Sequence, residues 1–228
     1  MMCIPKTTKL LSICSTRAHP KRCKEMLESF DKTKSEGTEI ILYVWTEDPK
    51  IKEYKELLKE RNVIYGPKRF MAEVLNYIST EVFPNVPYYQ NINDDHFFVT
   101  KGWDQMMLEP LDKNKGWGVS YCKGRFGAHN PNAEIISGKI VRTLGYYIYP
   151  AYRQFGLEPY VIEIGEKTGF FYIPEVIEHR SVNAGFGEKD DVYNFIYSPE
   201  EMGRSNQAHG EWSDKKEEAF NKIDKARQ

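Results

Sequence analysis

The sequence predicts an α/β protein in which helices flank a mixed, mostly parallel β-sheet. Apolar, β-rich runs and amphipathic helical stretches alternate three times before Asp94. Strands in this order pair in parallel, because each helix carries the chain back across the sheet before the next strand starts. Polar turns follow three of the strands, and the carboxyl ends of parallel strands lie at one edge of a sheet. We therefore expect the polar turns to lie close together.

The first two strand–helix units open the chain. Lys9–Cys14 predicts a buried strand, and a Ser-Thr-Arg turn leads from it into a helix at Pro20–Phe30, which has proline in its first turn. A second β-rich run, TEIILYVWTEDP, reaches a turn at Asp48 and precedes the charged amphipathic helix KIKEYKELLKERN. Both strands therefore end on polar residues.

A third unit leads into two adjacent acids. VIYG predicts a short strand and Arg69–Val82 a helix, after which the strand VPYYQNIN runs into Asp94 and Asp95. Adjacent carboxylates repel each other, so solvent, a nearby lysine or arginine, or a bound cation must offset their charge. The sequence leaves these three explanations open.

The second half of the chain is less regular. The Gly- and Lys-rich segment Lys113–His129 is long for a connection, and we expect a mobile loop there. Further on, IISGKIVRTLGYYIYP predicts a helix that ends near Gly145, and GLEPYVIEIGEKTG predicts a helix with Gly169 just past its end. FFYIPEVIEHR predicts one strand and WSDKKEEAFNKIDKAR a C-terminal helix.

Composition and charge limit the function classes. The 228 residues include 32 basic and 33 acidic side chains, a formal charge of −1, so the chain has no global positive field for polyanions, although a local basic patch remains possible. No run approaches the roughly 18 apolar residues that span a bilayer, so we expect no integral membrane contact. The four cysteines lack metal-type spacing, which indicates a reducing, cytoplasmic compartment.

A histidine strengthens the case for a metal site at the paired acids. Mg²⁺ and Mn²⁺ take oxygen ligands, commonly one or two carboxylates together with substrate phosphates. His179 ends a later apolar strand, so its imidazole can reach the same sheet edge as Asp95. The alternatives are a solvated acidic turn and a histidine that is exposed or bonded to a carbonyl group.

Four stretches give the chain a resemblance to a known family. From Lys9 to Asp191 it resembles the nucleotide-sugar glycosyltransferases of the GT-A fold. The stretches, in the family's order, are the Ser-Thr-Arg turn, NDDHFFVTKGWD, LGYYIYP and GLEPYVIEIGEKTGFFYIPEVIEH. The resemblance implies a GT-A, Rossmann-like α/β fold and a nucleoside diphosphate sugar, such as a UDP-sugar, as donor.

The resemblance also implies roles for residues at the sheet edge. The residues implied at the nucleotide are Thr16, Arg17, Asp48, Asn93 and Asp94. Asn93 stands where the family usually has the first Asp of its D-x-D motif, and an amide can bond a ribose but carries no charge.

Metal and diphosphate contacts follow from the same resemblance. Asp95 and His179 are implied as the ligands of Mn²⁺ or Mg²⁺. The candidate diphosphate contacts are Lys68, Arg69, Arg180 and Lys189. Most basic side chains in any chain are solvated surface charges, which is the competing interpretation of these four.

Glu158 matches the place of the family's catalytic base in inverting enzymes. Such a base takes the proton from the acceptor hydroxyl as the hydroxyl attacks the anomeric carbon. Glu163 lies nearby and is the alternative base, and an acid at Glu158 is also favoured simply by the helix dipole. Trp103 and Asp104 follow the paired acids and are candidates for shaping the sugar or acceptor side, although a large aromatic residue more often lies in the core.

The sequence therefore predicts a metal-dependent glycosyltransferase that inverts the configuration at the anomeric carbon. The acceptor hydroxyl can belong to a glycan, a protein, a small molecule or a modified DNA base. A nucleotidyltransferase and a non-catalytic sugar- or nucleotide-binding protein of the same fold are the alternatives. We expect one domain at 1–200, with a nucleotide-sugar half at 9–104 and an acceptor half at 105–200 that includes the loop at 113–129, followed by a helical tail at 201–228.

Overall fold

A computed structural model describes residues 4–124, 127–154, 156–174, 176–180, 194 and 198–228. A seven-stranded sheet has the order β3-β2-β1-β4-β7-β6-β8, and β5 pairs with β9 in a second sheet. The strands are β1 (Leu10–Thr16), β2 (Thr38–Trp45), β3 (Val63–Gly66), β4 (Tyr88–Ile92), β5 (His96–Phe98), β6 (Val119–Gly124), β7 (Gly127–Ser137), β8 (Phe170–Tyr172) and β9 (Ile177–His179). The helices are α1 (Pro20–Thr33), α2 (Ile51–Leu57), α3 (Met71–Tyr77), the π-helix η1 (Ile78–Val82), α4 (Trp103–Lys113), α5 (Gly138–Leu144), α6 (Glu158–Thr168) and α8 (Pro199–Arg227).

The first half of the sheet is parallel, as predicted. β1 pairs in parallel with both β2 and β4, and β2 pairs in parallel with β3. Cys14 lies beside Leu42 on one side and Ile92 on the other, so the three strands end at the same edge. β7 runs antiparallel to β4 and β6, which makes the sheet mixed. The predicted fold class is confirmed.

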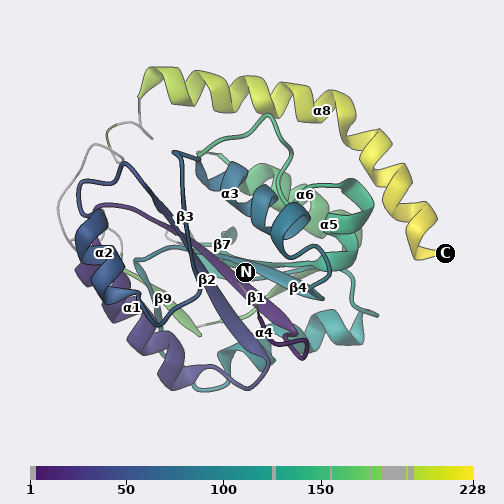
Figure 1. Cartoon of the computed structure of the whole chain (residues 1–228). Helices are drawn as coiled ribbons and strands as arrows, with labels where there is room; N and C mark the ends of the chain where they lie inside the picture. The colour runs from purple at the N-terminus through teal and green to yellow at the C-terminus, as the bar shows by residue number, and fades with distance from the viewer. Residues whose placement is uncertain (1–3, 125–126, 155, 175, 181–193, 195–197) are drawn as a thin grey trace.

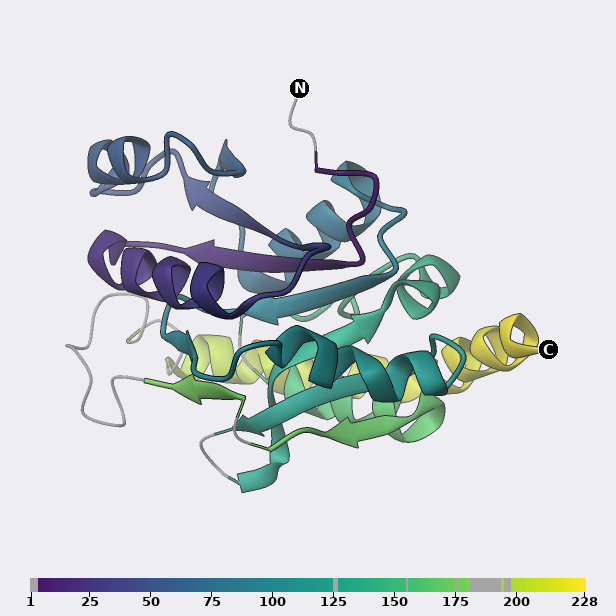
Figure 2. The ribbon, with the colours of Figure 1, turned by 90° about the horizontal axis from the view of Figure 1, so that it is seen from below.

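Two apolar cores cover the two faces of the sheet. One contains residues of α1, α2 and α4, including Phe30 and Trp103. The other contains residues of α3, α5, α6 and α8, including Leu75 and Trp212. Figures 1 and 2 show these helical layers, with α8 lying along the outside of α5 and α6. Strands covered on both faces read as continuous apolar runs, which is why β1 was visible in the sequence.

Two predictions for the second half are wrong. The segment predicted as a loop at Lys113–His129 contains β6 and the start of β7, because strand pairing satisfies the backbone of residues with low intrinsic β propensity. The single strand predicted after Gly169 is two strands in different sheets, since β8 pairs with β6 and β9 with β5. Pro174 lies between them and cannot donate to a strand ladder.

The C-terminal helix spans the tail expected at 201–228 and is longer than the stretch WSDKKEEAFNKIDKAR that predicted a helix. α8 begins at Pro199, and Ser198 caps it by accepting a hydrogen bond from the Glu201 amide at 3.2 Å. Its buried residues include Ala208, Trp212, Ala219 and Ile223, whose spacing of four, seven and four residues makes one helical stripe. The helical pattern before Trp212 was missed because polar residues and two glycines dilute it.

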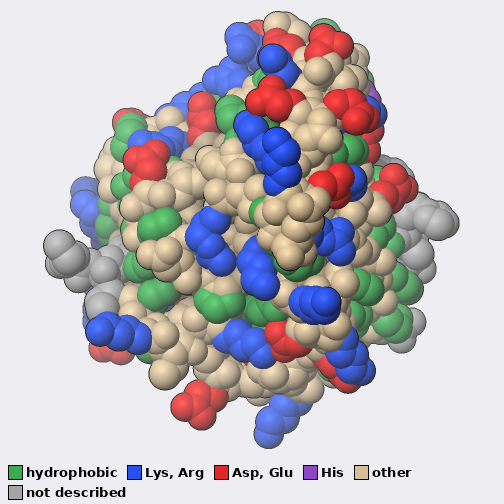
Figure 3. Space-filling model, turned by 90° about the vertical axis from the view of Figure 1, so that its right-hand side faces the viewer, with side chains coloured by type: hydrophobic (Ala, Val, Ile, Leu, Met, Phe, Trp, Pro, Cys, Tyr) green, Lys and Arg blue, Asp and Glu red, His purple; other side chains and the backbone are tan. Residues whose placement is uncertain are grey.

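The surface carries both signs of charge. Figure 3 shows lysine and arginine side chains interspersed with acidic ones on one side of the molecule. Several charged side chains of the protein are paired, as in Lys9–Asp112 at 2.7 Å and Lys167–Asp224 at 2.6 Å. Within the described ranges, none of the helices combines the length and the apolar character that crossing a membrane requires.

Candidate functional site at the carboxyl edge of the sheet

The acidic turn after β4 is held in shape by His96. The His96 amide donates to the Asn93 carbonyl at 3.1 Å, and the Asn93 amide donates to His96 Nδ1 at 3.2 Å. β5 starts at His96 and pairs with β9, where His96 lies opposite His179. This arrangement gives the two adjacent acids different surroundings.

Asp94 is neutralised by the protein itself. Its Oδ1 lies 2.8 Å from Arg22 Nη2 and 3.0 Å from Arg22 Nε, and its Oδ2 accepts a 2.6 Å hydrogen bond from Thr16. The side chain is buried, and burial raises its pKa while Arg22 opposes that rise. Of the three explanations for paired acids, a nearby arginine therefore applies to Asp94.

Thr16 is a buried support for Asp94. Its single hydroxyl proton is used in the bond to Asp94, so Tyr54 must donate the 2.8 Å hydrogen bond between the Tyr54 and Thr16 hydroxyls. The Tyr54 oxygen in turn accepts from the His19 amide at 3.1 Å. Thr16 is 1% exposed, so its hydroxyl orients Asp94 from below the edge of the sheet.

Asp48 braces the turn that carries Arg17. Its Oδ2 accepts from the Ala18 amide at 2.9 Å and its Oδ1 from the Lys50 amide at 2.7 Å. The carboxylate therefore ties the turn after β2 to the turn after β1. Arg17 extends from that turn with its guanidinium carbon 4.7 Å from the centre of the Trp45 ring.

Asp95 faces histidines. Its Oδ2 lies 3.1 Å from His179 Nε2, and its Oδ1 is buried without a hydrogen-bond partner among the described residues. Burial opposes ionisation of Asp95, but the His179 hydrogen bond and the charges of His96, His179 and Arg22 lower its pKa to about 2. The predicted pair Asp95 and His179 is thus in direct contact, with one carboxylate oxygen left to bind a ligand.

His96 is a third candidate ligand in the same cluster. Ligand atoms of Asp95, His96 and His179 all lie within 4.8 Å of one another. Burial lowers the pKa of His96 to about 4, so its ring is neutral. Because Nδ1 accepts the Asn93 amide, the proton of this neutral ring lies on Nε2, which faces Asp95 Oδ1 at 4.0 Å. His96 Nε2 therefore carries a proton, and so does His179 Nε2, because it donates the hydrogen bond to the ionised Asp95 carboxylate. Either nitrogen would release its proton on binding a cation.

The predicted base Glu158 lies at the first turn of α6, and a second carboxyl lies close to it. Glu134, on β7, is 5% exposed and accepts a 3.1 Å hydrogen bond from Asn91. Burial and the nearby charge of Glu158 raise the pKa of Glu134 to about 8, and burial also raises the pKa of Glu158. At neutral pH this pair therefore carries a proton, with Glu134 as the neutral acid.

Glu163, the alternative base, is used in packing. Its Oε2 accepts a 2.6 Å hydrogen bond from the Trp212 indole, and its Oε1 lies 3.2 Å from Lys216. Both partners belong to α8, so Glu163 fastens the C-terminal helix to α6.

Trp103 and Asp104 also lie in packed structure. Trp103 is fully buried in a core cluster. Asp104 accepts hydrogen bonds from the Ser35 amide and hydroxyl, each at 2.9 Å. Both residues therefore support the fold beneath the acidic turn.

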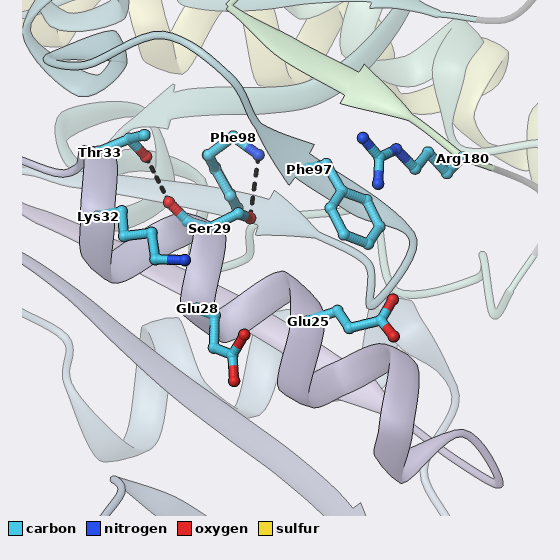
Figure 4. A pocket seen from close by; sticks show the side chains of 8 residues that line it. All are labelled: Glu25, Glu28, Ser29, Lys32, Thr33, Phe97, Phe98 and Arg180. Atoms are coloured by element: carbon cyan, nitrogen blue, oxygen red, sulfur yellow. Dashed lines mark hydrogen bonds between the residues drawn. The ribbon is translucent and has the colours of Figure 1, made fainter.

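Arg180 lines an open groove on the outer side of β5. Its guanidinium lies 4.0 Å from the centre of the Phe97 ring and bonds Glu178 at 2.9 and 3.0 Å. Figure 4 shows it across from side chains of α1 in a groove of about 350 Å³, which is lined by Glu25, Glu28, Ser29, Lys32, Thr33, Phe97, Phe98 and Arg180. The side chain of Arg180 is thus paired with Glu178 and Phe97, while its amide bonds the Asp95 carbonyl at 2.8 Å. Lys189 lies outside the described residues.

Two residues of this region were not predicted as site residues. His96 stood inside the quoted motif, but only the strand pairing of β5 with β9 places it opposite His179. Glu134 belongs to the segment after the supposed loop, where an isolated acid in NPNAEII gave no signal of burial. A strand pattern in which Glu134 shares a face with Ile136 was the available hint.

Comparisons with known proteins concern the fold. No protein-family model and no curated protein matches the sequence. Among solved structures, glucosyl-3-phosphoglycerate synthase from Mycobacterium tuberculosis, in complex with Mn²⁺, UDP-glucose and phosphoglyceric acid, gives a TM-score of 0.60 at 11% identity, covering 89% of this chain and 80% of the other. S. aureus TarS 1-349 gives a TM-score of 0.56 at 11% identity, and the match covers 72% of this chain and 58% of the other.

A nucleotidyltransferase is also similar. A cytidylyltransferase from Leptospira borgpetersenii gives a TM-score of 0.53 at 18% identity, covering 76% of this chain and 78% of the other. The chain spans 58% of TarS 1-349, the first of these matches, and identities this low bear on architecture alone. Together with the sheet order and the helical layers, they show that the chain has a GT-A-like α/β fold.

Proposed function

We propose that the protein is a metal-dependent glycosyltransferase that moves a sugar from a nucleoside diphosphate sugar to an acceptor hydroxyl. The observation that carries this proposal is the contact between Asp95 and His179 at the carboxyl edge of a GT-A-like sheet, with Asp95 Oδ1 unpartnered among the described residues. A UDP-sugar donor is supported by the neighbours crystallised with UDP-GlcNAc and UDP-glucose.

Asp95 and His179 fit a divalent cation. A carboxylate oxygen without a protein partner and an imidazole nitrogen beside it form a mixed O/N donor set suited to Mn²⁺, while Mg²⁺ would rely more on water and phosphate oxygens. A similar fold binds Mn²⁺ in glucosyl-3-phosphoglycerate synthase. A bound ion would offset negative charge on the departing diphosphate.

The donor would lie across the ends of β1, β2 and β4. Arg17 offers a guanidinium whose Nε is buried and unpartnered among the described residues. The turns at this edge are held in place by the hydrogen bonds of Thr16, Asp48 and Asp94 described above, so we assign these three residues to positioning the turns that bind the nucleotide. Asn93 lies at the start of the acidic turn. Nucleotide binding thus depends on a preorganised set of turns.

Glu158 would act as the base in an inverting transfer. Its carboxylate takes the proton of the acceptor hydroxyl while the hydroxyl oxygen forms a bond to the anomeric carbon. The bond from that carbon to the diphosphate oxygen breaks, and its electron pair leaves with the nucleoside diphosphate. The raised pKa of Glu158 makes it a stronger base than an exposed glutamate.

A nucleotidyltransferase is the second candidate, because a cytidylyltransferase shares the fold. The two reactions release different products. A panel of nucleoside triphosphates and nucleoside diphosphate sugars, with Mn²⁺ or Mg²⁺ and mixed acceptors, separates them by whether pyrophosphate or a nucleoside diphosphate appears. We expect UDP release from a UDP-sugar. Pyrophosphate release from a triphosphate would reverse the assignment.

Thermal unfolding tests binding without a known acceptor. A nucleotide sugar that binds the folded protein raises the unfolding temperature. We expect this rise with Mn²⁺ and its loss on chelation. A rise that chelation leaves unchanged would contradict the metal assignment, and binding without any turnover would favour a non-catalytic protein.

A further inference from the structure

Positively charged side chains and aromatic rings alternate along one line at the carboxyl edge of the sheet. Arg17 lies 4.7 Å from the centre of the Trp45 ring, and Lys68 lies 5.3 Å from the same ring. Lys68 Nζ also lies 5.1 Å from the centre of the Phe70 ring, and the guanidinium carbon of Arg153 lies 4.0 Å from the same centre. The two rings contact each other edge to face at 6.3 Å. We call these five residues the cation–aromatic row.

The row brings three positive charges together, and its two arginines form no ion pair with a carboxylate among the described residues. Arg17 Nε is buried without a hydrogen-bond partner among the same residues. Aromatic faces stabilise nearby cations but leave their N–H groups free to bond an anion. The row therefore has the composition of a site for negatively charged ligands.

The two ends of the row lie at different parts of the proposed site. Arg17 follows Thr16, whose hydroxyl bonds Asp94, so this end adjoins the acidic turn. Arg153 belongs to the loop before α6. Its carbonyl accepts from the Ala72 amide at 2.8 Å, and the neighbouring Gln154 side chain accepts from the Met71 amide at 2.9 Å, which fastens the loop to the start of α3.

Arg153 and the proposed base belong to one short segment of the chain. Arg153 lies in the loop that leads into α6, and Glu158 is the first residue of that helix. The Arg153 end of the row thus belongs to the same segment as the base, to which an acceptor must bring its hydroxyl. A divalent ion already matches the diphosphate charge of a donor, so Arg153 is left to bind a further anion.

We propose that Arg153, with Lys68 beside it on the Phe70 ring, binds an anionic group on the acceptor, such as a phosphate or a carboxylate. This inference rests on the proposed glycosyl transfer for the meaning of "acceptor". The binding of an oxyanion at Arg153 itself does not depend on that reaction. A guanidinium fixed on an aromatic ring loses little freedom on binding, which favours a planar, two-point contact with such a group.

Calorimetric titration of the full-length protein with sulfate and, separately, with acetate tests the proposal. The protein is first saturated with UDP and Mn²⁺, so that the donor site is filled. We expect sulfate to bind this complex and R153Q to weaken that binding roughly tenfold, the usual scale for one charged hydrogen-bonding contact. R153K, which keeps the charge, should lose less. Acetate titrations show whether a carboxylate is accepted as well.

The matched control is R61Q, because Arg61 is an exposed arginine paired with Asp31 on another surface. It should leave sulfate affinity unchanged, and melting curves confirm that both variants are folded. Equal sulfate affinity in wild type and R153Q would overturn the proposal, as would displacement of UDP by sulfate, which would assign the row to the donor alone. If UDP fails to bind, the proposed function fails, and sulfate titration of the ligand-free wild type and R153Q still tests the anion site.

Discussion

Two pairs of acids lie at the carboxyl edge of the sheet, and the side chains that contact them differ in charge. Asp94 and Asp95 have cationic or imidazole partners, Arg22 at 2.8 Å and His179 at 3.1 Å. Glu134 is buried and Glu158 is partly buried, but the side-chain partner of Glu134 is the neutral amide of Asn91 at 3.1 Å. A carboxylate with positive partners keeps its charge, whereas one with neutral partners keeps a proton. Within the first pair Arg22 already occupies Asp94, so Asp95 is the acid suited to binding a cation, whereas the second pair is suited to moving a proton.

The largest effect is expected from Asp95→Asn. The amide keeps the size of the side chain but removes the charge that faces the proposed ion, so Mn²⁺ binding and metal-dependent transfer should be lost while the fold remains. Electron paramagnetic resonance of free Mn²⁺ measures the binding directly. Asp31→Asn, at an exposed ion pair, is the control. Undiminished Mn²⁺ affinity in Asp95→Asn would remove the distinction between the two acid pairs.

Glu158→Gln should affect turnover but not donor binding. Removal of a general base typically lowers the rate on the order of 10²-fold or more, whereas UDP-sugar affinity should stay unchanged. Glu163→Gln is the comparison, because Glu163 bonds Trp212 and should change stability more than turnover. The opposite pattern, slow turnover in Glu163→Gln alone, would move the base to Glu163.

The two histidines opposite each other on β5 and β9 should differ. His179→Asn should weaken Mn²⁺ binding by roughly 10- to 100-fold, since an imidazole nitrogen beside Asp95 is lost. His96→Asn should weaken it less, because His96 is 1% exposed and its Nε2 lies 4.0 Å from Asp95, against 3.1 Å for His179. Manganese titration of both variants gives the comparison. A greater loss in His96→Asn would show that His96 ligates the ion in the other tautomer.

The smallest effect on metal and donor binding is expected from Glu134→Gln, which should instead alter how stability depends on pH. Glu134 stays protonated in the folded protein up to a pKa of about 8, whereas the ordinary value is 4.5. Between these values the unfolded chain has released the proton and the folded one has not, so wild-type stability falls as pH rises.

Glutamine cannot ionise, so the variant should lose less stability than the wild type between pH 5 and pH 8, by an amount on the order of a few kcal/mol. Urea unfolding at both pH values measures it, and Glu178→Gln at the exposed pair with Arg180 is the control. Parallel pH profiles for wild type and Glu134→Gln would mean that Glu134 is already ionised in the folded protein.

The sequence by itself determined the parallel half of the sheet and the residues at its edge. Continuous apolar runs such as Leu10–Cys14 need cover on both faces, and alternation with helices makes their pairing parallel. Because the carboxyl ends of β1, β2 and β4 lie at one edge of the sheet, Thr16, Asp48 and Asp94 come close together. The contact of His179 with Asp95 was expected from the family resemblance in the order of the motifs.

Tertiary structure alone decided what each of these side chains contacts. Local sequence does not reveal that Arg22 forms an ion pair with Asp94, since the two residues are 72 positions apart and meet only when β1 and β4 pair. Burial of Glu134 depends likewise on the antiparallel pairing of β7 with β4, which places it beside Asn91. Whether an acid holds a charge or a proton is set by such long-range neighbours, because burial and nearby charges, and not residue type, fix its pKa.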